Sequence, residues 1–373
     1  MKRILFITNE FPPITAGIAN FSFNLSEQLC ISGYDIFVLV YQGDMSIKDG
    51  IGADSKLRFK VFRVSWVLGN LGTYFSRLFY AIKLLLIYAP DILIITNRQA
   101  LFLFPFLKLL FFKRSIVVIH GNELLLKNKL VRKWIRYSIS LADEIIAVSN
   151  YTRLLIDDST LYNRCKVINN GVSEELLRIG ANDNKQYSSE NCLVFSTVGT
   201  VRPRKGHLQV LRHLVNIRDR FPNFKYIICG KIQFANYYKE LIKFITDHKL
   251  SENVSFISDI EYDNVQGLAN VYSQTSIYLL LSEEQTDGDT EGFGISVLEA
   301  NAFGVPAIVS NRCGTADAVK QGYNGMQIYT HDEKDFENSL NKILSDYKSF
   351  SNNARYWAEE HAWHNVARMY PIE

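Results

Sequence analysis

The strongest constraint on the fold is a regular alternation of short apolar runs with segments long enough to form a helix. Runs such as residues 91–96 and 115–119 are nearly continuous in Val, Ile and Leu, which is typical of strands buried on both faces. Strands that alternate with helices predict a parallel sheet covered on both sides. We expect strands at 3–8, 35–41, 59–64, 91–96, 115–120, 144–149, 165–169, 193–198, 225–229, 253–257, 276–281, 306–310 and 326–329. In the first half we expect helices at 18–32, 73–88, 98–111, 128–141 and 150–158.

The length and composition indicate two globular domains. A chain of 373 residues is long for a single hydrophobic core. The polar stretch at 180–191 is almost free of apolar side chains and predicts a linker between two doubly wound α/β halves. A net charge of +3 is too small to indicate nucleic acid as the main partner.

Cysteine usage and the N-terminus predict a cytoplasmic protein. The five cysteines are scattered and include no C-x-x-C pair, so neither a zinc site nor a disulfide framework is indicated. The apolar run at 3–8 is short and reads as a first buried strand rather than a secretion signal. No uncharged apolar stretch reaches the roughly 18 residues that a membrane-spanning helix needs.

The segment that begins at Glu291 carries the clearest chemical pattern. Glu291 and Glu299 flank an apolar, helix-like run that Gly292 and Gly294 open. A turn followed by a helix N-terminus presents backbone N–H groups to an anion such as phosphate. Carboxylates accept hydrogen bonds from the hydroxyls of a sugar or a ribose. The segment lies between two strand-like runs, so it predicts a nucleotide-sugar site at the carboxyl edge of a sheet, although an ordinary helix with two surface glutamates has the same pattern.

This segment resembles the E-x7-E signature of the retaining glycosyltransferases of family four. The resemblance implies the GT-B fold, in which two Rossmann-like doubly wound domains face a central cleft. It also implies a first, acceptor-binding domain at 1–180 completed by a C-terminal crossover helix at 352–373. The donor-binding domain would then occupy 181–351.

A cluster of basic residues follows the first strand of the second half. Arg202, Arg204 and Lys205 lie in one short loop, and such cations at a strand end suit a diphosphate, although a solvated basic loop is the alternative. Lys205 and Gly206 match the lysine–glycine element of the resembled family. The family arginine falls on Thr200, so Arg202 or Arg204 must supply the missing charge, and we prefer Arg204.

Two elements of the first half also match the resembled family. His120 ends a strand and precedes Gly121, like the family histidine that contacts the donor sugar; from the residues alone, a core histidine bonded to a loop carbonyl is favoured. Gly17 opens the helix after the first strand, where the family shows two adjacent glycines and this chain has Ala16 at the first. The amides after Gly17 could bind an anion, although a plain strand-to-helix turn explains the loop equally well.

The resemblance assigns roles to these residues. Glu291 and His120 would be catalytic, Gly292 and Glu299 would bind the donor sugar and ribose, and the diphosphate would be held by Gly17, Arg204, Lys205, Phe293 and Gly294. The donor would be a UDP- or GDP-sugar, and the acceptor a saccharide, often lipid-linked, in bacterial surface polysaccharide synthesis. We expect no cofactor and no metal, because the D-x-D-like run 287–289 lies in an acidic insert expected to be solvated.

A basic amphipathic helix is expected between residues 127 and 136. Its charged face is formed by Lys129, Arg132, Lys133 and Arg136, which fall within an arc of about 100° at ~100° per residue. Leu130, Val131 and Trp134 face the other way. This pattern indicates peripheral contact with the anionic inner face of a membrane, and the alternative is a solvated helix packed on the sheet.

The sequence is compatible with other functions as well. A GT-B-type sugar-nucleotide epimerase or hydrolase would use the same pocket. An inactive sugar-nucleotide-binding scaffold subunit is also compatible with the departures at Ala16 and Thr200. A nicotinamide dehydrogenase is disfavoured because the G-x-G-x-x-G fingerprint is absent from the first loop.

Overall fold

The computed structural model describes residues 1–14, 16–41, 54–64, 69–111, 113–183, 192–258 and 264–372. Its contacts divide the chain into two compact units. The first is Met1–Ile168 together with Trp363–Glu373, and the second is Asn169–Ala362. Most of the expected linker, residues 184–191, lies outside the described residues.

The first unit is built on a parallel sheet that contains every strand expected in the first half. The strands are β1 (Arg3–Thr8), β2 (Asp35–Tyr41), β3 (Lys60–Val64), β4 (Ile92–Thr96), β5 (Arg114–Ile119), β6 (Glu144–Ala147) and β7 (Cys165–Val167). Their order across the sheet is β3-β2-β1-β4-β5-β6-β7, with parallel pairing throughout the described strands. Each strand end lies within two residues of its expected position.

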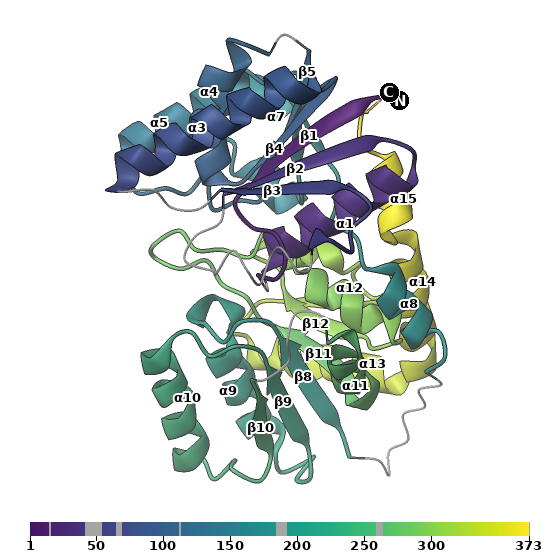
Figure 1. Ribbon diagram of the computed structural model, residues 1–373. Coiled ribbons are helices and arrows are strands. Elements are labelled where there is room, and N and C mark those ends of the chain that lie inside the picture. The colour runs from purple at the N-terminus through teal and green to yellow at the C-terminus, as the bar shows by residue number, and fades with distance from the viewer. Residues whose placement is uncertain are drawn as a thin grey trace. The chain divides into compact units, whose positions relative to one another are not determined.

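Helices cover both faces of this sheet. They are α1 (Gly17–Ile31), α3 (Gly69–Tyr88), α4 (Arg98–Lys108), α5 (Lys129–Ser140), α6 (Asn150–Leu154), α7 (Ser159–Arg164) and α15 (Trp363–Arg368). Side chains alternate between the two faces of a strand, so Leu5 and Ile7 join the core with α3, α4 and α5. Phe6 points the other way and meets Phe21 of α1, with ring centroids 6.2 Å apart. Figure 1 shows α3, α4 and α5 side by side on one face and α1 on the other.

The C-terminal tail returns to the first unit, but later than expected. Trp363 is fully buried, and its ring lies 5.8 Å from that of Phe21 in α1. Residues 169–180 and 352–362, which were expected in the first domain, belong to the second unit. They do so because α8 (Glu174–Gly180) packs on α11 (Val265–Gln274) and α12 (Ile295–Ala302), and α14 (Tyr347–Glu360) packs on α12.

The second unit repeats the doubly wound plan. Its strands are β8 (Val194–Val198), β9 (Lys225–Cys229), β10 (Val254–Ile257), β11 (Ile277–Leu280), β12 (Ala307–Ser310) and β13 (Gly325–Ile328). The order is β10-β9-β8-β11-β12-β13, and the described pairs are again parallel. The remaining elements of this unit are α9 (His207–Ile217), α10 (Ala235–Asp247), α13 (Glu333–Ser345) and the short 3₁₀ helices η1 (Pro203–Lys205) and η2 (Gly314–Ala318).

The strand order reverses direction between β8 and β11 in the second sheet, as it does between β1 and β4 in the first. In open α/β sheets, ligands bind beyond the carboxyl ends of the strands at such a reversal. The loop after β8 carries the basic cluster, and the loop after β11 carries Glu291. The topology therefore places both predicted segments at the same edge of one sheet.

Candidate functional site

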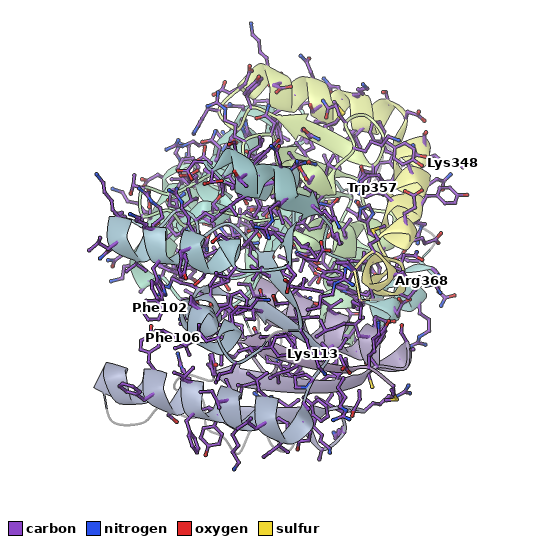
Figure 2. All side chains as sticks on the ribbon, turned by 90° about the horizontal axis from the view of Figure 1, so that it is seen from above. Phe102, Phe106, Lys113, Lys348, Trp357 and Arg368 are labelled. Carbon is purple, nitrogen blue, oxygen red and sulfur yellow. The ribbon has the colours of Figure 1, made fainter. Side chains whose placement is uncertain are left out.

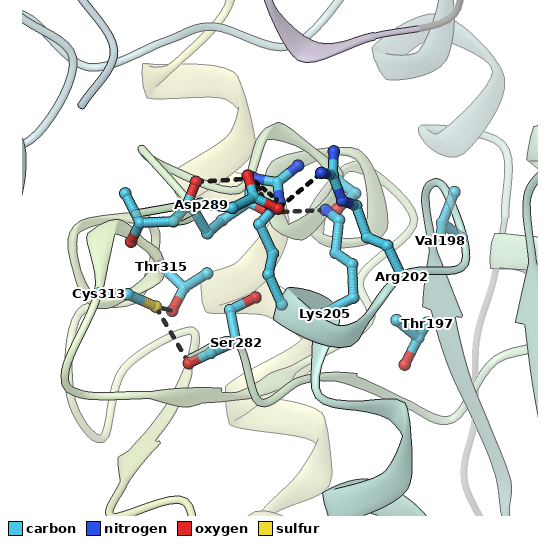
Figure 3. A network of polar contacts seen from close by, with 12 residues as sticks. Thr197, Val198, Arg202, Lys205, Ser282, Asp289, Cys313 and Thr315 are labelled. Carbon is cyan, nitrogen blue, oxygen red and sulfur yellow. Dashed lines mark hydrogen bonds and ion pairs between the residues drawn. The ribbon is translucent and has the colours of Figure 1, made fainter. Parts of the chain in front are cut away.

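Basic and acidic side chains meet where β8 and β11 end. The Nζ atom of Lys205 lies 2.9 Å from Oε2 of Glu291, and Nη1 of Arg204 lies 3.2 Å from the same oxygen. Asp289 adds a second carboxylate, 2.6 Å from Nη2 of Arg202 and 3.5 Å from Nε of Arg204. Figure 3 shows these ion pairs as one connected network.

Burial makes this network stronger than a surface ion pair. The side chains of Lys205 and Glu291 are only 8% and 12% exposed. Burial by itself would raise the pKa of Glu291, but the positive charges of Arg204 and Lys205 outweigh it and lower that pKa to about 2. Glu291 is therefore a carboxylate at neutral pH, held in place by two cations.

A glycine fixes the basic loop against the end of β11. Gly206 has φ of +72°, and a Cβ atom at this position would lie 1.9 Å from the carbonyl oxygen of Leu281. The amide of Glu283 donates to the carbonyl of Arg204 at 3.0 Å. Only glycine combines this backbone conformation with so close an approach, so Gly206 sets the position of Lys205.

Close backbone contact with Gly314 fixes the turn that begins at Glu291. Gly294 adopts φ of +88° at the position just before α12, and Phe293 before it is buried. A Cβ atom on Gly314 would lie 2.0 Å from the carbonyl oxygen of Gly292, and the Gly314 amide donates to the Glu291 carbonyl at 2.9 Å. The loop that follows β12 therefore packs against this turn and holds its backbone in place.

The second glutamate of the motif has a different environment. Glu299 lies in the middle of α12 and is buried, and its Oε2 accepts a hydrogen bond of 2.7 Å from the hydroxyl of Tyr272. Tyr272 comes from α11, and burial raises the pKa of its hydroxyl well above the usual value. Tyr272 thus donates to Glu299, whereas Glu291 is paired with cations.

The predicted residues of the first unit also lie at strand ends. His120 follows β5, and its Nε2 is 2.7 Å from the hydroxyl of Thr96 at the end of β4. Glu123 accepts a hydrogen bond of 2.5 Å from the His120 amide and holds the turn. Burial lowers the pKa of His120 to about 3, so its imidazole is neutral at physiological pH.

Gly17 is the first residue of α1, as its position in the sequence predicts. Among the described residues outside its own helical turn and its chain neighbours, a Cβ atom there would meet no atom within 4 Å, and Ala16 before it is extended and provides no side-chain cap. Packing within the protein therefore does not require glycine at position 17.

Asp289 also belongs to this network, although the sequence predicts it as part of a solvated insert. Its carboxylate is mostly buried between Arg202 and Arg204. A signal was present, because the two arginines are two residues apart and so are Asp289 and Glu291. Among the residues that the structure describes, no group of three or more His, Cys, Asp or Glu side chains could hold a metal ion.

The basic helix is present as α5. Asn128 caps it by accepting hydrogen bonds from the amides of Leu130 and Val131, as asparagine commonly does at this position. Lys129 and Lys133 are exposed, and Arg132 is half-buried. In the described part of the chain, no helix is long and apolar enough to cross a membrane.

The charged and apolar sides of α5 are less separated than expected. Arg136 pairs with Asp157 at 2.6 Å, so this residue of the basic face is partly neutralised. Val131 and Trp134 pack toward the core, whereas Leu130 is exposed.

Comparison with known proteins identifies the family of this chain. Residues 15–176 match the family described as Glycosyltransferase Family 4, and residues 180–360 match Glycosyl transferases group 1. The chain belongs to glycosyltransferase family four. Its relatives include an uncharacterised glycosyltransferase of Methanocaldococcus jannaschii, which is 27% identical over 66% of this chain and 64% of its own length.

Another relative is the UDP-Gal:alpha-D-GlcNAc-diphosphoundecaprenol alpha-1,3-galactosyltransferase of Escherichia coli, 25% identical over 58% of this chain and 56% of the relative. The matches thus span less than two thirds of these relatives. Among solved structures, Anabaena HepE in complex with UDP and glucose has a TM-score of 0.75 and 18% identity, covering 99% of this chain and 98% of its own. The two-domain α/β GT-B fold expected for this family-four member is confirmed.

Proposed function

We propose that this family-four protein is a retaining glycosyltransferase that moves a sugar from a nucleoside diphosphate-sugar to a lipid-linked saccharide in surface polysaccharide synthesis. The observation that carries the proposal is the contact of two cations, the buried Lys205 and the largely buried Arg204, with Glu291 at the carboxyl ends of β8 and β11. The UDP and glucose bound by HepE support a UDP donor, and GDP is the alternative. The name of the Escherichia coli relative supports a diphosphate-linked lipid acceptor.

The cations suit the charge that develops during glycosyl transfer. As the bond between sugar and diphosphate breaks, negative charge grows on the leaving diphosphate. Lys205 and Arg204 are largely shielded from water, so they would stabilise this charge more strongly than surface residues could. The amides at Phe293 and Gly294, next to the N-terminus of α12, would add hydrogen-bond donors.

The two glutamates would act as hydrogen-bond acceptors with separate tasks. Glu291 remains ionised far below neutral pH, so it would accept hydrogen bonds from the hydroxyls of the donor sugar. The carboxylate of Glu299, oriented by Tyr272, would accept from the ribose. The retaining course of the reaction comes from the resemblance to the family.

Two residues of the first unit are also proposed to contact a ligand. The imidazole of His120 is neutral at pH 7, so we propose that it forms a hydrogen bond to substrate and does not act as a charged acid. The empty space around the Cβ position of Gly17 would let a phosphate group approach the backbone.

We propose that transfer needs no metal ion or other cofactor. Arg204 and Lys205 would supply the positive charge that Mg²⁺ supplies to diphosphates in other enzymes. In the Asp-Gly-Asp run, the second carboxylate, Asp289, is engaged by Arg202.

Calorimetric titration with UDP, GDP and ADP, with and without magnesium, tests the donor site. We expect one nucleoside diphosphate to bind with an affinity that magnesium does not change. Lys205→Met should weaken this affinity by about tenfold or more, because a charge-assisted hydrogen bond to phosphate is lost. Lys113→Met, a substitution at an exposed lysine, is the matched control and should bind like the wild type. Absence of binding for all three nucleotides, or unchanged affinity in Lys205→Met, would contradict the assignment.

Product analysis separates a transferase from the other enzyme classes. A transferase should consume the donor rapidly only when a saccharide acceptor is present. Rapid formation of an epimer or of free sugar in the absence of acceptor would indicate an epimerase or a hydrolase instead.

A further inference from the structure

Helix α3 of the first unit carries apolar side chains on its inner and its outer face. Its inner face, which includes Ala81, Leu84 and Leu85, is buried in the core against the sheet. Its outer face carries exposed aromatic and aliphatic side chains: Phe75 (71% exposed), Phe79 (63%), Tyr80, Leu86 (77%) and Ile87. At ~100° per residue these five and Lys83 fall within an arc of about 140°. A helix that is hydrophobic all round normally has a second apolar neighbour.

The apolar surface continues from α3 across α4 to α5. Aromatic rings join the three helices: Tyr74 of α3 lies 5.2 Å from Phe102 of α4, and Trp134 of α5 lies 6.0 Å from Phe102 and 5.8 Å from Phe106. The indole N–H of Trp134 donates to the Phe102 carbonyl at 2.9 Å. Figure 2 shows Phe102 and Phe106 next to each other on α4.

Further exposed side chains widen this surface at both edges. They are Phe106, Leu109 and Leu110 at the end of α4, and Leu130 and Tyr137 on α5. We call the whole set, with the outer face of α3, the α3–α5 surface. Monomeric soluble proteins rarely expose an apolar surface on three adjacent helices, so such a surface marks an interaction site.

The charged residues on these three helices indicate an anionic partner. Not one aspartate or glutamate occurs in α3, α4 or α5. The basic residues are Arg77 and Lys83 on α3, Arg98 and Lys108 on α4, and Lys129, Arg132, Lys133 and Arg136 on α5. Lys108 and Arg136 pair with acids from other segments, and Arg77 is buried. Within the described residues, the exposed Lys83, Lys129 and Lys133 take part in no ion pair.

We propose that the α3–α5 surface binds an anionic lipid bilayer, with α3 lying in the plane of the interface. Phe75, Phe79, Leu86 and Ile87 would enter the boundary between headgroups and acyl chains. Apolar side chains bordered by lysines and arginines, with no acidic residue, match this environment. The inference extends the membrane contact expected from α5 to α3 and α4. It does not rest on the proposed glycosyl transfer, because lipid binding needs neither donor nor acceptor.

Sedimentation of the full chain with lipid vesicles tests the proposal. We expect binding to vesicles of phosphatidylcholine with phosphatidylglycerol, and weaker binding to phosphatidylcholine alone. The double variant Phe79→Ser/Leu86→Ser should reduce the partition coefficient by about tenfold or more, because two inserted side chains are lost. The control Ile31→Ser/Leu154→Ser removes two apolar side chains that are similarly exposed on α1 and α6 and should bind like the wild type.

A charge variant tests the electrostatic part separately. Lys129→Gln/Lys133→Gln should weaken binding to the anionic vesicles by about fivefold or more per lysine at low salt, and the difference should shrink as salt is added. All variants should keep the wild-type melting temperature, since the changed side chains are exposed.

Several outcomes would overturn the proposal. Equal binding to neutral and anionic vesicles would show that the surface does not require anionic lipid. Unchanged binding of Phe79→Ser/Leu86→Ser would show that α3 does not contact the bilayer. A dimer in solution that this variant dissociates, without vesicle binding by the wild type, would assign the surface to a second copy of the chain. Nucleotide titration of the same variant distinguishes a loss of vesicle binding from damage to the donor site. A variant that no longer binds vesicles should still bind nucleotide.

Discussion

Replacement of Glu291 by glutamine should destabilise the second unit, because it leaves two largely buried cations with one carboxylate fewer. Lys205 contacts Glu291 at 2.9 Å and Arg204 contacts it at 3.2 Å, and their side chains are 8% and 16% exposed. Glutamine keeps the size of the side chain and one hydrogen-bond acceptor but removes the charge. The effect therefore reports the ion pairing itself.

The magnitude follows from the pKa of Glu291. That pKa falls from an ordinary value of 4.5 to about 2 in the folded protein. A difference of one in pKa corresponds to about 1.4 kcal/mol, so the ionised carboxylate contributes about 3 kcal/mol to the free energy of unfolding. Removal of one partner from a buried ion pair destabilises proteins by a similar amount, about 3–5 kcal/mol. For a unit of this size, about 3 kcal/mol corresponds to a melting temperature lower by roughly 6–12 °C.

Calorimetric unfolding with a double-mutant cycle measures this contribution. Calorimetry is suitable because the two units can unfold in separate transitions. Glu291→Gln and Lys205→Met would be made alone and together, and the double variant should be more stable than the sum of the single changes by about 1–3 kcal/mol. Lys113→Met serves as the control, since its pair with Asp91 is 54% and 39% exposed and should contribute less than about 1 kcal/mol.

Two results would refute this reasoning. If Glu291→Gln melts within the range of the Lys113→Met control, the carboxylate is not a structural partner of the cations. If the two changes are simply additive, Glu291 and Lys205 do not interact in the folded protein.

Two further predictions concern the same unit. The stability difference between the wild type and Glu291→Gln should be complete above pH 4.5 and should shrink as the pH falls from 4.5 toward 2, because the pKa of Glu291 is lower in the folded state. Melting temperatures measured as a function of pH test this. A stability difference that stays constant over this range would contradict the prediction. Tyr272→Phe removes the hydroxyl that donates to Glu299 and should weaken the affinity for a nucleoside diphosphate by about threefold to tenfold in calorimetric titration. The free nucleobase, which has no ribose, should bind equally to Tyr272→Phe and to the wild type. Equal affinity of Tyr272→Phe and wild type for the nucleotide would separate Glu299 from ribose binding.

The strands and the main elements of the candidate site were predictable because their signals are local. A strand buried on both faces needs a continuous apolar run, and the runs at 91–96 and 225–229 could be placed from the sequence alone. Lys205 and Glu291 were found for a related reason, since each stands beside glycines that a tight turn at a strand end requires.

Other features depended on segments far apart in the sequence. Asp289 resembles any residue of a solvated acidic loop until folding brings it against Arg202. Nothing in the local sequence shows that Gly314 must be glycine, because the reason is the carbonyl of Gly292 on a different loop. The domain boundary moved from 180 to Ile168 because α8 finds its packing partners in the second unit.

The sequence by itself determined the doubly wound α/β plan, the family, and the loops at which a ligand would bind, because periodicity and turn chemistry act over a few neighbouring residues. Only the tertiary structure decided which cation pairs with which carboxylate and which side of α3 is exposed. The physical reason is that these features depend on contacts between distant segments. For α3 in particular, apolar residues occur on both faces of the helix, so periodicity could not distinguish its buried side from its exposed one.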